Sequence, residues 1–244
     1  MRYKVTVAYD GRAYVGFQSQ INGLAIQDVI EKGLRKIFNQ DDLRIVMASR
    51  TDKGVHARDQ VFHFDHEKVI EPAGLKMAIN TFMPNDIHIL KVEHVDSSFH
   101  ARYLVKNKTY EYLVNLGEYD VFLNGYAYQC YYKLDIEKMI EASKLFIGTH
   151  DFTSFNTSPK DLYPNQVRTI YEFEIRKDGD HLIFRIKGDG FLRHMVRIIV
   201  GTLIELGRGK KNISDVKEMF DHPTKSKRRY NIDGAGLYLM KIEY

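Results

Sequence analysis

The stretch of sequence richest in chemically capable side chains runs from Arg50 to Arg58, with the letters RTDKGVHAR. It places one carboxylate, Asp52, among the basic residues Arg50, Lys53 and Arg58 and the imidazole of His56. A tight turn explains part of this pattern, because Asp can bond to its own backbone and Gly can supply a positive φ. A turn alone does not require so many basic groups around one carboxylate. Asp52 is therefore a candidate catalytic group.

A second candidate is Arg197, in a helix expected over residues 191–206. From Met195 onward this helix is apolar nearly all round, which is typical of a buried helix. A guanidinium does not lose its proton in a protein, so Arg197 must meet a carboxylate or other acceptors. A structural ion pair with any acidic residue would satisfy it. The sharper hypothesis pairs Arg197 with Asp52 and so keeps that carboxylate ionised at pH 7.

A third candidate is Tyr110, in the segment KNKTYEY at residues 106–112. In a strand, Tyr110 and Tyr112 point to one face and Glu111 points to the other. An aromatic ring beside lysines can stack on a base exposed from a nucleic acid. Packing of both tyrosines into a hydrophobic core is the alternative.

The hydrophobic pattern predicts the elements that position these residues. In the first part of the chain we expect strands at 3–9, 43–49, 60–64 and 87–94 and helices at 25–38 and 72–80. In the second part we expect strands at 108–115, 166–176, 181–187 and 236–244 and helices at 136–147 and 191–206. Each part has the order β-α-β-β-α-β. The sequence thus predicts an α+β protein of two ferredoxin-like halves, whose mostly antiparallel sheets form a central cleft. The expected subdomains are residues 1–104, with the Asp52 loop, and 105–244, with Tyr110 and Arg197.

Composition limits the class of protein. The chain has 244 residues, of which 44% are hydrophobic and 28% charged, as in ordinary globular proteins. Its one cysteine, Cys130, excludes an internal disulfide and makes a structural zinc site unlikely, and no other metal-ligand spacing is present. The first residues are charged and no apolar run is long enough to span a membrane, so we expect a cytoplasmic protein with no membrane partner.

Positive charge gathers near the end of the chain, although the net charge is only +4. Residues 207–229, called here the basic segment, hold eight lysines and arginines against three acidic residues. Such an excess suits a polyanionic partner, although many charge runs are simply solvated faces.

Eight short motifs are spread along the chain: residues 16–18 (GFQ), 50–57 (RTDKGVHA), 99–102 (FHAR), 108–110 (KTY), 148–152 (GTHDF), 167–170 (VRTI), 195–201 (MVRIIVG) and 236–239 (GLYL). Taken together, they closely resemble the motifs of the tRNA pseudouridine synthase A family. The likeness covers nearly the whole chain and keeps the family's order of motifs. Departures are Ser49 where the family usually has Gly, Lys53 where it usually has Ala, and residues 232–235 before the last strand.

The resemblance implies an isomerase that converts uridine to pseudouridine in the anticodon stem-loop of tRNA, at positions 38 to 40. It also implies a homodimer that needs no metal or organic cofactor. Asp52 would be the nucleophile, with attack at C1′ or C6 of the nucleotide, or a path through a glycal, left open. The resemblance also implies that Arg197 lies beside Asp52 and that Tyr110 stacks on the extruded uracil. Arg50 would fill the vacated stack or hold the RNA backbone, and Arg58 and the basic segment would bind phosphates. Leu237 or Leu239 would form an apolar wall.

Two other classes of function fit the residues. A non-catalytic tRNA-binding or RNA chaperone module would use only the basic segment and the tyrosines. A hydrolase would use Asp52 and His56 and would cleave its substrate. Analysis of the product nucleosides separates both from an isomerase.

Overall fold

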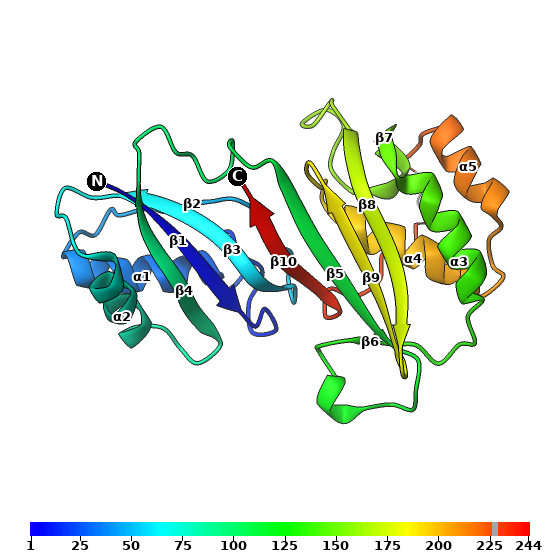
Figure 1. Ribbon diagram of the computed structural model, residues 1–244, viewed down its shortest axis with the longest axis horizontal. Helices are drawn as coiled ribbons and strands as arrows, with labels where there is room; N and C mark the ends of the chain where they lie inside the picture. Colours follow the sequence, from blue (N-terminus) through cyan, green and yellow to red (C-terminus); the bar gives the residue numbers. More distant parts are fainter. Residues whose placement is uncertain (226–228) are drawn as a thin grey trace. The chain divides into compact units, whose positions relative to one another are not determined.

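The computed structural model describes residues 1–225 and 229–244, which form two compact units (Figure 1). The first unit contains residues Met1–Lys106 and Tyr238–Tyr244, and the second contains Asn107–Leu237. The last strand therefore groups with the first unit, although the sequence placed it with residues 105–244. It does so because it pairs with a strand of the first unit.

In the first unit, the strands lie in the order β4-β1-β3-β10, and β2 also pairs with β3. β1 runs antiparallel to β3 and β4, whereas β10 runs parallel to β3. The two helices α1 and α2 pack against each other. The elements are β1 (Arg2–Tyr9), α1 (Ile26–Phe38), β2 (Val46–Met47), β3 (His56–Asp65), α2 (Pro72–Thr81), β4 (Ile87–Val95) and β10 (Leu237–Glu243).

The local sequence explains these elements. Tyr3, Val5 and Val7 alternate along β1 and are fully buried, as expected for a strand with one face in the core. The helix α1 buries one stripe of its surface, including Ile30, and ends at Asn39, which takes the left-handed conformation with φ 53°.

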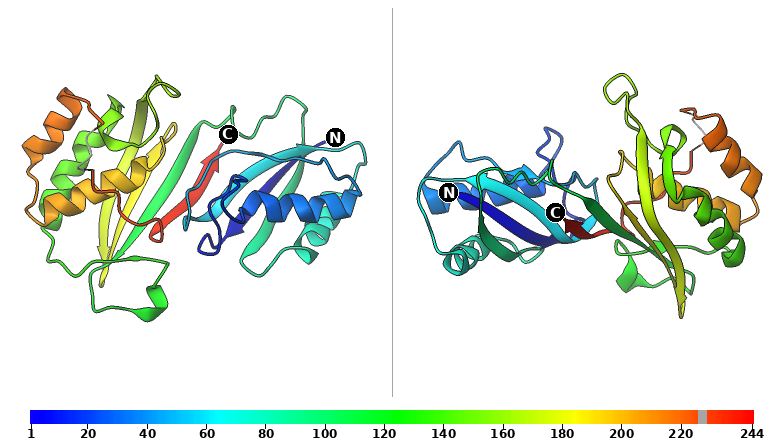
Figure 2. Two further views of the ribbon diagram at one scale, coloured as in Figure 1. Left: turned by 180° about the vertical axis from the view of Figure 1, so that it is seen from behind. Right: turned by 45° about the horizontal axis from the view of Figure 1, so that its top comes forward.

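In the second unit, the antiparallel order is β5-β9-β8-β7, with the short β6 parallel to β5. The helices α3, α4 and α5 lie together on one face of this sheet (Figures 1 and 2). The elements are β5 (Asn107–Asn115), β6 (Tyr128–Gln129), α3 (Ile136–Ser143), β7 (Gly148–Asp151), β8 (Val167–Asp178), β9 (His181–Gly188), α4 (Met195–Gly207) and α5 (Ile213–Asp221), with short 3-10 turns at Val121–Leu123, Lys144–Phe146 and Thr153–Phe155.

The predicted fold class is confirmed: the protein is α+β, and its sheets are mostly antiparallel. Several details of the prediction were wrong. The strand expected at 43–49 is reduced to the two residues of β2, and α5 and β7 were not anticipated. The helix expected from residue 191 begins only at Met195, because His194 takes a left-handed conformation with φ 60° that a right-handed helix cannot contain.

Candidate active site

The Asp52 loop connects β2 to β3, and a buried polar network fixes its start. Gln60 of β3 is fully buried, and its amide both accepts from the Ser49 N–H (3.2 Å) and donates to the Ser49 carbonyl (2.7 Å). The hydroxyls of Tyr9 and Thr51 are 2.7 Å apart and hydrogen-bonded. Because these groups are buried, each bond is worth more than on the surface, and the backbone on the amino side of Asp52 is held firmly.

A second segment, residues 11–17, packs against the other side of the loop at very close range. The Phe17 N–H donates to the Thr51 carbonyl at 3.2 Å. A Cβ on Gly16 would lie 2.7 Å from that same carbonyl oxygen, and one on Gly11 would lie 2.0 Å from the Val55 oxygen. Only glycine fits at either position.

The loop contains the expected turn, with Gly54 supplying the positive φ. The Val55 N–H donates to the Asp52 carbonyl at 3.2 Å, and Gly54 has φ +75°. Within this turn Asp52 is half-buried, whereas Arg50 and Arg58 are exposed. The arrangement presents one carboxylate from a rigid turn with cationic side chains at the surface around it.

His56 has a structural position at the start of β3. Its side chain is 3% exposed and its Nδ1 accepts from the Gly11 N–H at 3.2 Å, with the Asp10 carboxylate 3.3 Å away. Its ring stacks on Tyr238 of β10 with centroids 4.7 Å apart. His56 therefore joins the 11–17 segment and β10 to the strand that carries the Asp52 loop.

In the second unit, the tyrosines of β5 are packed. Tyr110 is 6% exposed, and its ring forms a T-shaped pair with the ring of Phe191, with centroids 5.2 Å apart and planes at 83°. Tyr112 is fully buried and donates to the Asp233 carbonyl at 2.6 Å. Burial raises the pKa of Tyr112 well above its usual value, and the nearby positive charge of Arg197 partly opposes this.

Arg197 lies half-buried on the first turn of α4, and its Nε donates to the Ile232 carbonyl at 2.7 Å. Residues 232–235, which depart from the family pattern, thus contact both Arg197 and Tyr112. The next residue also lies close, since a Cβ on Gly236 would lie 2.8 Å from the Tyr112 ring. Leu237, which follows, is 5% exposed. Sequence analysis assigned no functional role to Tyr112 or Asp233. The pairing of Arg197 with Asp52 joins different units and stays a prediction.

Some side chains of the basic segment make contacts inside the second unit. Arg208 lies 3.5 Å over the Tyr132 ring and bonds to Glu205 at 2.8 Å. Lys225 donates to the Asn156 and Gln166 side chains at 2.7 and 2.6 Å, and desolvation lowers its pKa to about 8. Exposed members include Lys210 and Lys217, whereas Lys227 and Arg228 lie outside the described residues.

The described residues contain no group of three His, Cys, Asp or Glu side chains arranged to hold a metal ion. Within the same part of the chain, no helix is both long and apolar enough to cross a membrane.

Comparison with known proteins shows to which family the chain belongs. The model of the family described as tRNA pseudouridine synthase matches residues 5–104 and 142–244. The chain belongs to this family. It is therefore an isomerase that acts on tRNA, and the resemblance of its motifs is confirmed. Asp52 and Arg197 lie inside the two matched ranges, and Tyr110 lies between them.

Curated relatives support the same assignment over the whole chain. The tRNA pseudouridine synthase A of Anoxybacillus flavithermus is 42% identical over 243 residues, which cover 100% of this chain and 98% of that protein. A tRNA pseudouridine synthase A 1 of Bacillus cereus is 43% identical, with 100% and 98% covered. The tRNA pseudouridine synthase A of Oceanobacillus iheyensis is 41% identical, with 100% and 96% covered.

Proposed function

We propose that this pseudouridine synthase modifies uridines at positions 38 to 40 of the tRNA anticodon stem-loop, with Asp52 as the nucleophile, in the cytoplasm. The observation that carries the role of Asp52 is the way its loop is held. Buried bonds from Gln60 and Tyr9 fix one side of the loop, and the Phe17 amide fixes the other. Such preorganisation is what a nucleophile needs to meet a reacting atom without a further ordering cost. The choice of stem-loop rests on the resemblance of the motifs.

The reaction needs few groups. The bond from N1 of uracil to C1′ of the ribose breaks, the base turns, and C5 bonds to C1′, while the C5 proton leaves and N1 takes up a proton. Atoms and electrons balance without an oxidant or a group carrier. Asp52 attacks C1′ or C6, or removes a sugar proton on the glycal route; each path requires an ionised carboxylate. We propose that Arg197 is the cation that keeps Asp52 ionised.

The binding groups are assigned by residue type and by the motifs in which they lie. The target uridine must leave its stack, which takes a few kcal/mol of interaction energy. We assign the uracil face to Tyr110 and the neighbouring apolar wall to Leu237. The exposed guanidiniums of Arg50 and Arg58 then hold the distorted backbone, where bidentate contacts to phosphate are favourable.

The test is product analysis with Asp52→Asn, an isosteric change that removes the charge. We expect no tritium release from tRNA labelled at C5 of uridine, with tRNA affinity within about threefold of wild type. Arg197→Met is expected to lose activity almost as completely. Release at the wild-type rate from Asp52→Asn would refute the nucleophile. Binding without any pseudouridine from the wild-type protein would favour a non-catalytic module instead.

The position in tRNA is tested separately. Pseudouridine mapping in tRNA from cells that lack this protein should show losses at 38, 39 and 40. A loss confined to another arm of tRNA would refute the proposed target while leaving the chemistry intact.

We also propose a homodimer, supported by residues 117–133 of the second unit, called here the aromatic loop. Its hydrogen bonds make it rigid, because Asn115 and Gln129 bond to each other and to the backbone of the loop. Yet Phe122 is 85% exposed and Tyr131 69%. A rigid loop that displays large apolar side chains is typical of a protein interface.

Charge indicates which partner fits this surface. The loop adjoins a cavity of about 530 Å³ lined by the carboxylates of Glu118, Asp120, Asp178 and Asp180. These carboxylates repel RNA phosphates, whereas they complement the exposed lysines of the basic segment on a second copy of the chain. We expect Phe122→Ser to dissociate the dimer in light scattering and Ile140→Ser, an exposed apolar control on α3, to leave it intact. A dimer unaffected by Phe122→Ser would refute this surface, and a monomeric wild-type protein would refute the dimer.

A further inference from the structure

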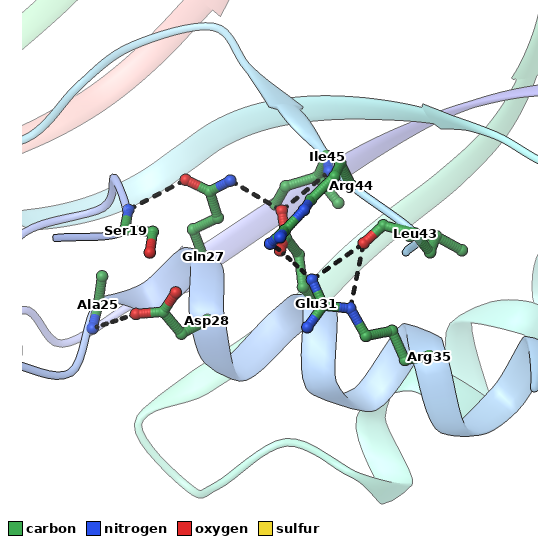
Figure 3. Close-up of polar contacts among 9 residues, drawn as sticks. All are labelled: Ser19, Ala25, Gln27, Asp28, Glu31, Arg35, Leu43, Arg44 and Ile45. Carbon is green, nitrogen blue, oxygen red and sulfur yellow. Dashed lines mark hydrogen bonds and ion pairs between the residues drawn. The ribbon is translucent and has the colours of Figure 1, made fainter. Parts of the chain in front are cut away.

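A buried carboxylate lies in the first unit, away from Asp52. Glu31 on α1 is 1% exposed, and its two oxygens accept four hydrogen bonds (Figure 3). Oε2 accepts from Arg35 and Arg44, both at 2.7 Å. Oε1 accepts from the Gln27 side chain at 2.7 Å and from the Ile45 backbone N–H at 3.1 Å.

This arrangement satisfies the carboxylate. A buried charge is very unfavourable unless it is paired and hydrogen-bonded, and two oxygens offer about four acceptor positions. Here two guanidiniums supply the charge, and an amide and a backbone N–H complete the set. The Arg35 guanidinium also donates to the Leu43 carbonyl at 3.2 Å. Both Glu31 and Arg35 therefore join α1 to residues 43–45. Loss of Oε1 as an acceptor would leave the buried Ile45 N–H unsatisfied, and loss of the charge on Oε2 would weaken both bonds from the guanidiniums.

One set of bonds leads from Glu31 to the Asp52 loop through the amino end of α1. Gln27, held by Glu31, accepts from the Ser19 N–H through its side chain at 3.0 Å. The Gln27 backbone N–H donates to the Phe17 carbonyl at 2.9 Å. Phe17 in turn donates to the carbonyl of Thr51, the residue before Asp52. Each step is a hydrogen bond, and the last one ends on the backbone of the loop.

The other set leads through the chain segment that enters the loop. Ile45, bonded to Glu31, precedes β2, which pairs with β3. The Ala48 N–H then donates to the Val61 carbonyl at 2.8 Å, and Ser49 engages Gln60. Glu31 is therefore connected by hydrogen bonds to both segments that confine the Asp52 loop.

We propose that Glu31 is a positioning residue for the Asp52 loop. Its carboxylate fixes α1 against residues 43–45 and, through Gln27, against residues 16–19, and so sets the position of Asp52. The inference rests on the proposed role of Asp52. It assigns to Glu31 no contact with the substrate.

The test compares Glu31→Gln with Asp28→Asn. Asp28 lies on the same helix, and its carboxylate bonds to the Ala25 N–H at 3.1 Å as a helix cap. Both variants lose one negative charge and some stability, but only Glu31 bonds to the segments that confine the loop. For Glu31→Gln we expect kcat to fall on the order of 10- to 100-fold, as for a displaced reacting group, with KM for tRNA within about twofold. Asp28→Asn should keep kcat.

Hydrogen exchange gives a second readout. In Glu31→Gln, the amides of Phe17 and Val55, which bond to the loop, should exchange faster than in Asp28→Asn at matched global stability. If Glu31→Gln does not fold, Arg44→Gln removes one donor from a side chain that is 68% exposed and should show the same effect at smaller size.

The outcomes separate the two proposals. Wild-type kcat in Glu31→Gln, or unchanged exchange at Phe17 and Val55, refutes the positioning role if Asp52→Asn is inactive. An active Asp52→Asn refutes the proposed nucleophile, whatever Glu31 does. A fall in kcat equal in Glu31→Gln and Asp28→Asn also refutes positioning, because it would reflect general loss of stability.

Discussion

Mild acid should destabilise the protein through one buried histidine, His63 of β3. Its side chain is 4% exposed, and its Nδ1 accepts a hydrogen bond from the Ala101 N–H at 3.1 Å. Burial, reinforced by the positive charge of Arg2 and by His100, lowers the pKa of His63 from 6.5 to about 4, and the carboxylate of Asp65 only partly opposes this. Protonation would also replace the acceptor at Nδ1 with a donor that faces another donor.

The sign and size follow from linkage. The pKa of His63 is lower in the folded state than in the unfolded state, so the folded protein binds fewer protons between pH 6.5 and 4. Stability is therefore full above about pH 6.5 and falls as the pH drops toward 4. A difference of about 2.5 between the two pKa values corresponds to a loss of about 3 kcal/mol in the free energy of unfolding.

The assay is urea unfolding at a series of pH values from 7.5 to 4, with wild type and His63→Gln compared. Glutamine offers an oxygen to the Ala101 N–H and does not titrate in this range. Carboxylates common to both proteins cancel in the difference. We expect the stability of wild type relative to the variant to fall by about 3 kcal/mol across the range. Parallel curves, or an NMR titration of His63 with a midpoint near 6.5, would refute the reasoning.

Three further outcomes are expected. Gly11→Ala should fail to reach the native loop packing, with a loss of several kcal/mol in chemical denaturation, because its Cβ would lie 2.0 Å from the Val55 oxygen. Tyr112→Phe should lose about 1 to 2 kcal/mol by removing the bond to the Asp233 carbonyl, without a change in tRNA affinity. Cys130, which is 2% exposed and whose thiol pKa is raised by burial, should react with a thiol reagent only at the rate of unfolding.

Sequence patterns predicted the elements with strong periodicity. The apolar face of α1 and the alternation in β1 each depend on neighbours close in the chain, so their extents agree with the structure to within one residue. The predicted start of α4 was wrong for a local reason: His194 takes a left-handed conformation, which the hydrophobic pattern does not reveal. The strand expected at 43–49 is shortened to β2 because some of its residues bond outside the sheet; the Ile45 N–H, for example, donates to the Glu31 carboxylate.

The candidate site was only partly predictable. The turn at Asp52 can be predicted from the local sequence, because Gly54 supplies its positive φ. Gln60 was not anticipated, because nothing in a strand sequence distinguishes a glutamine that bonds to a loop eleven residues earlier from one facing solvent. Glu31 was missed because charged residues on an amphipathic helix are normally exposed. Its burial depends on Arg44, thirteen residues away.

The two units hold their candidate residues by different kinds of force, which has consequences for function. Tyr110 is held by aromatic packing, which changes little with pH or salt. The Asp52 loop is held through directional bonds that end on the charge of Glu31, so its position depends on every donor in that network. Loss of one partner in such a network leaves the others unsatisfied. Substitutions around Glu31 should therefore lower kcat by more than their loss of stability explains, whereas substitution of Tyr110 itself should change packing and binding together.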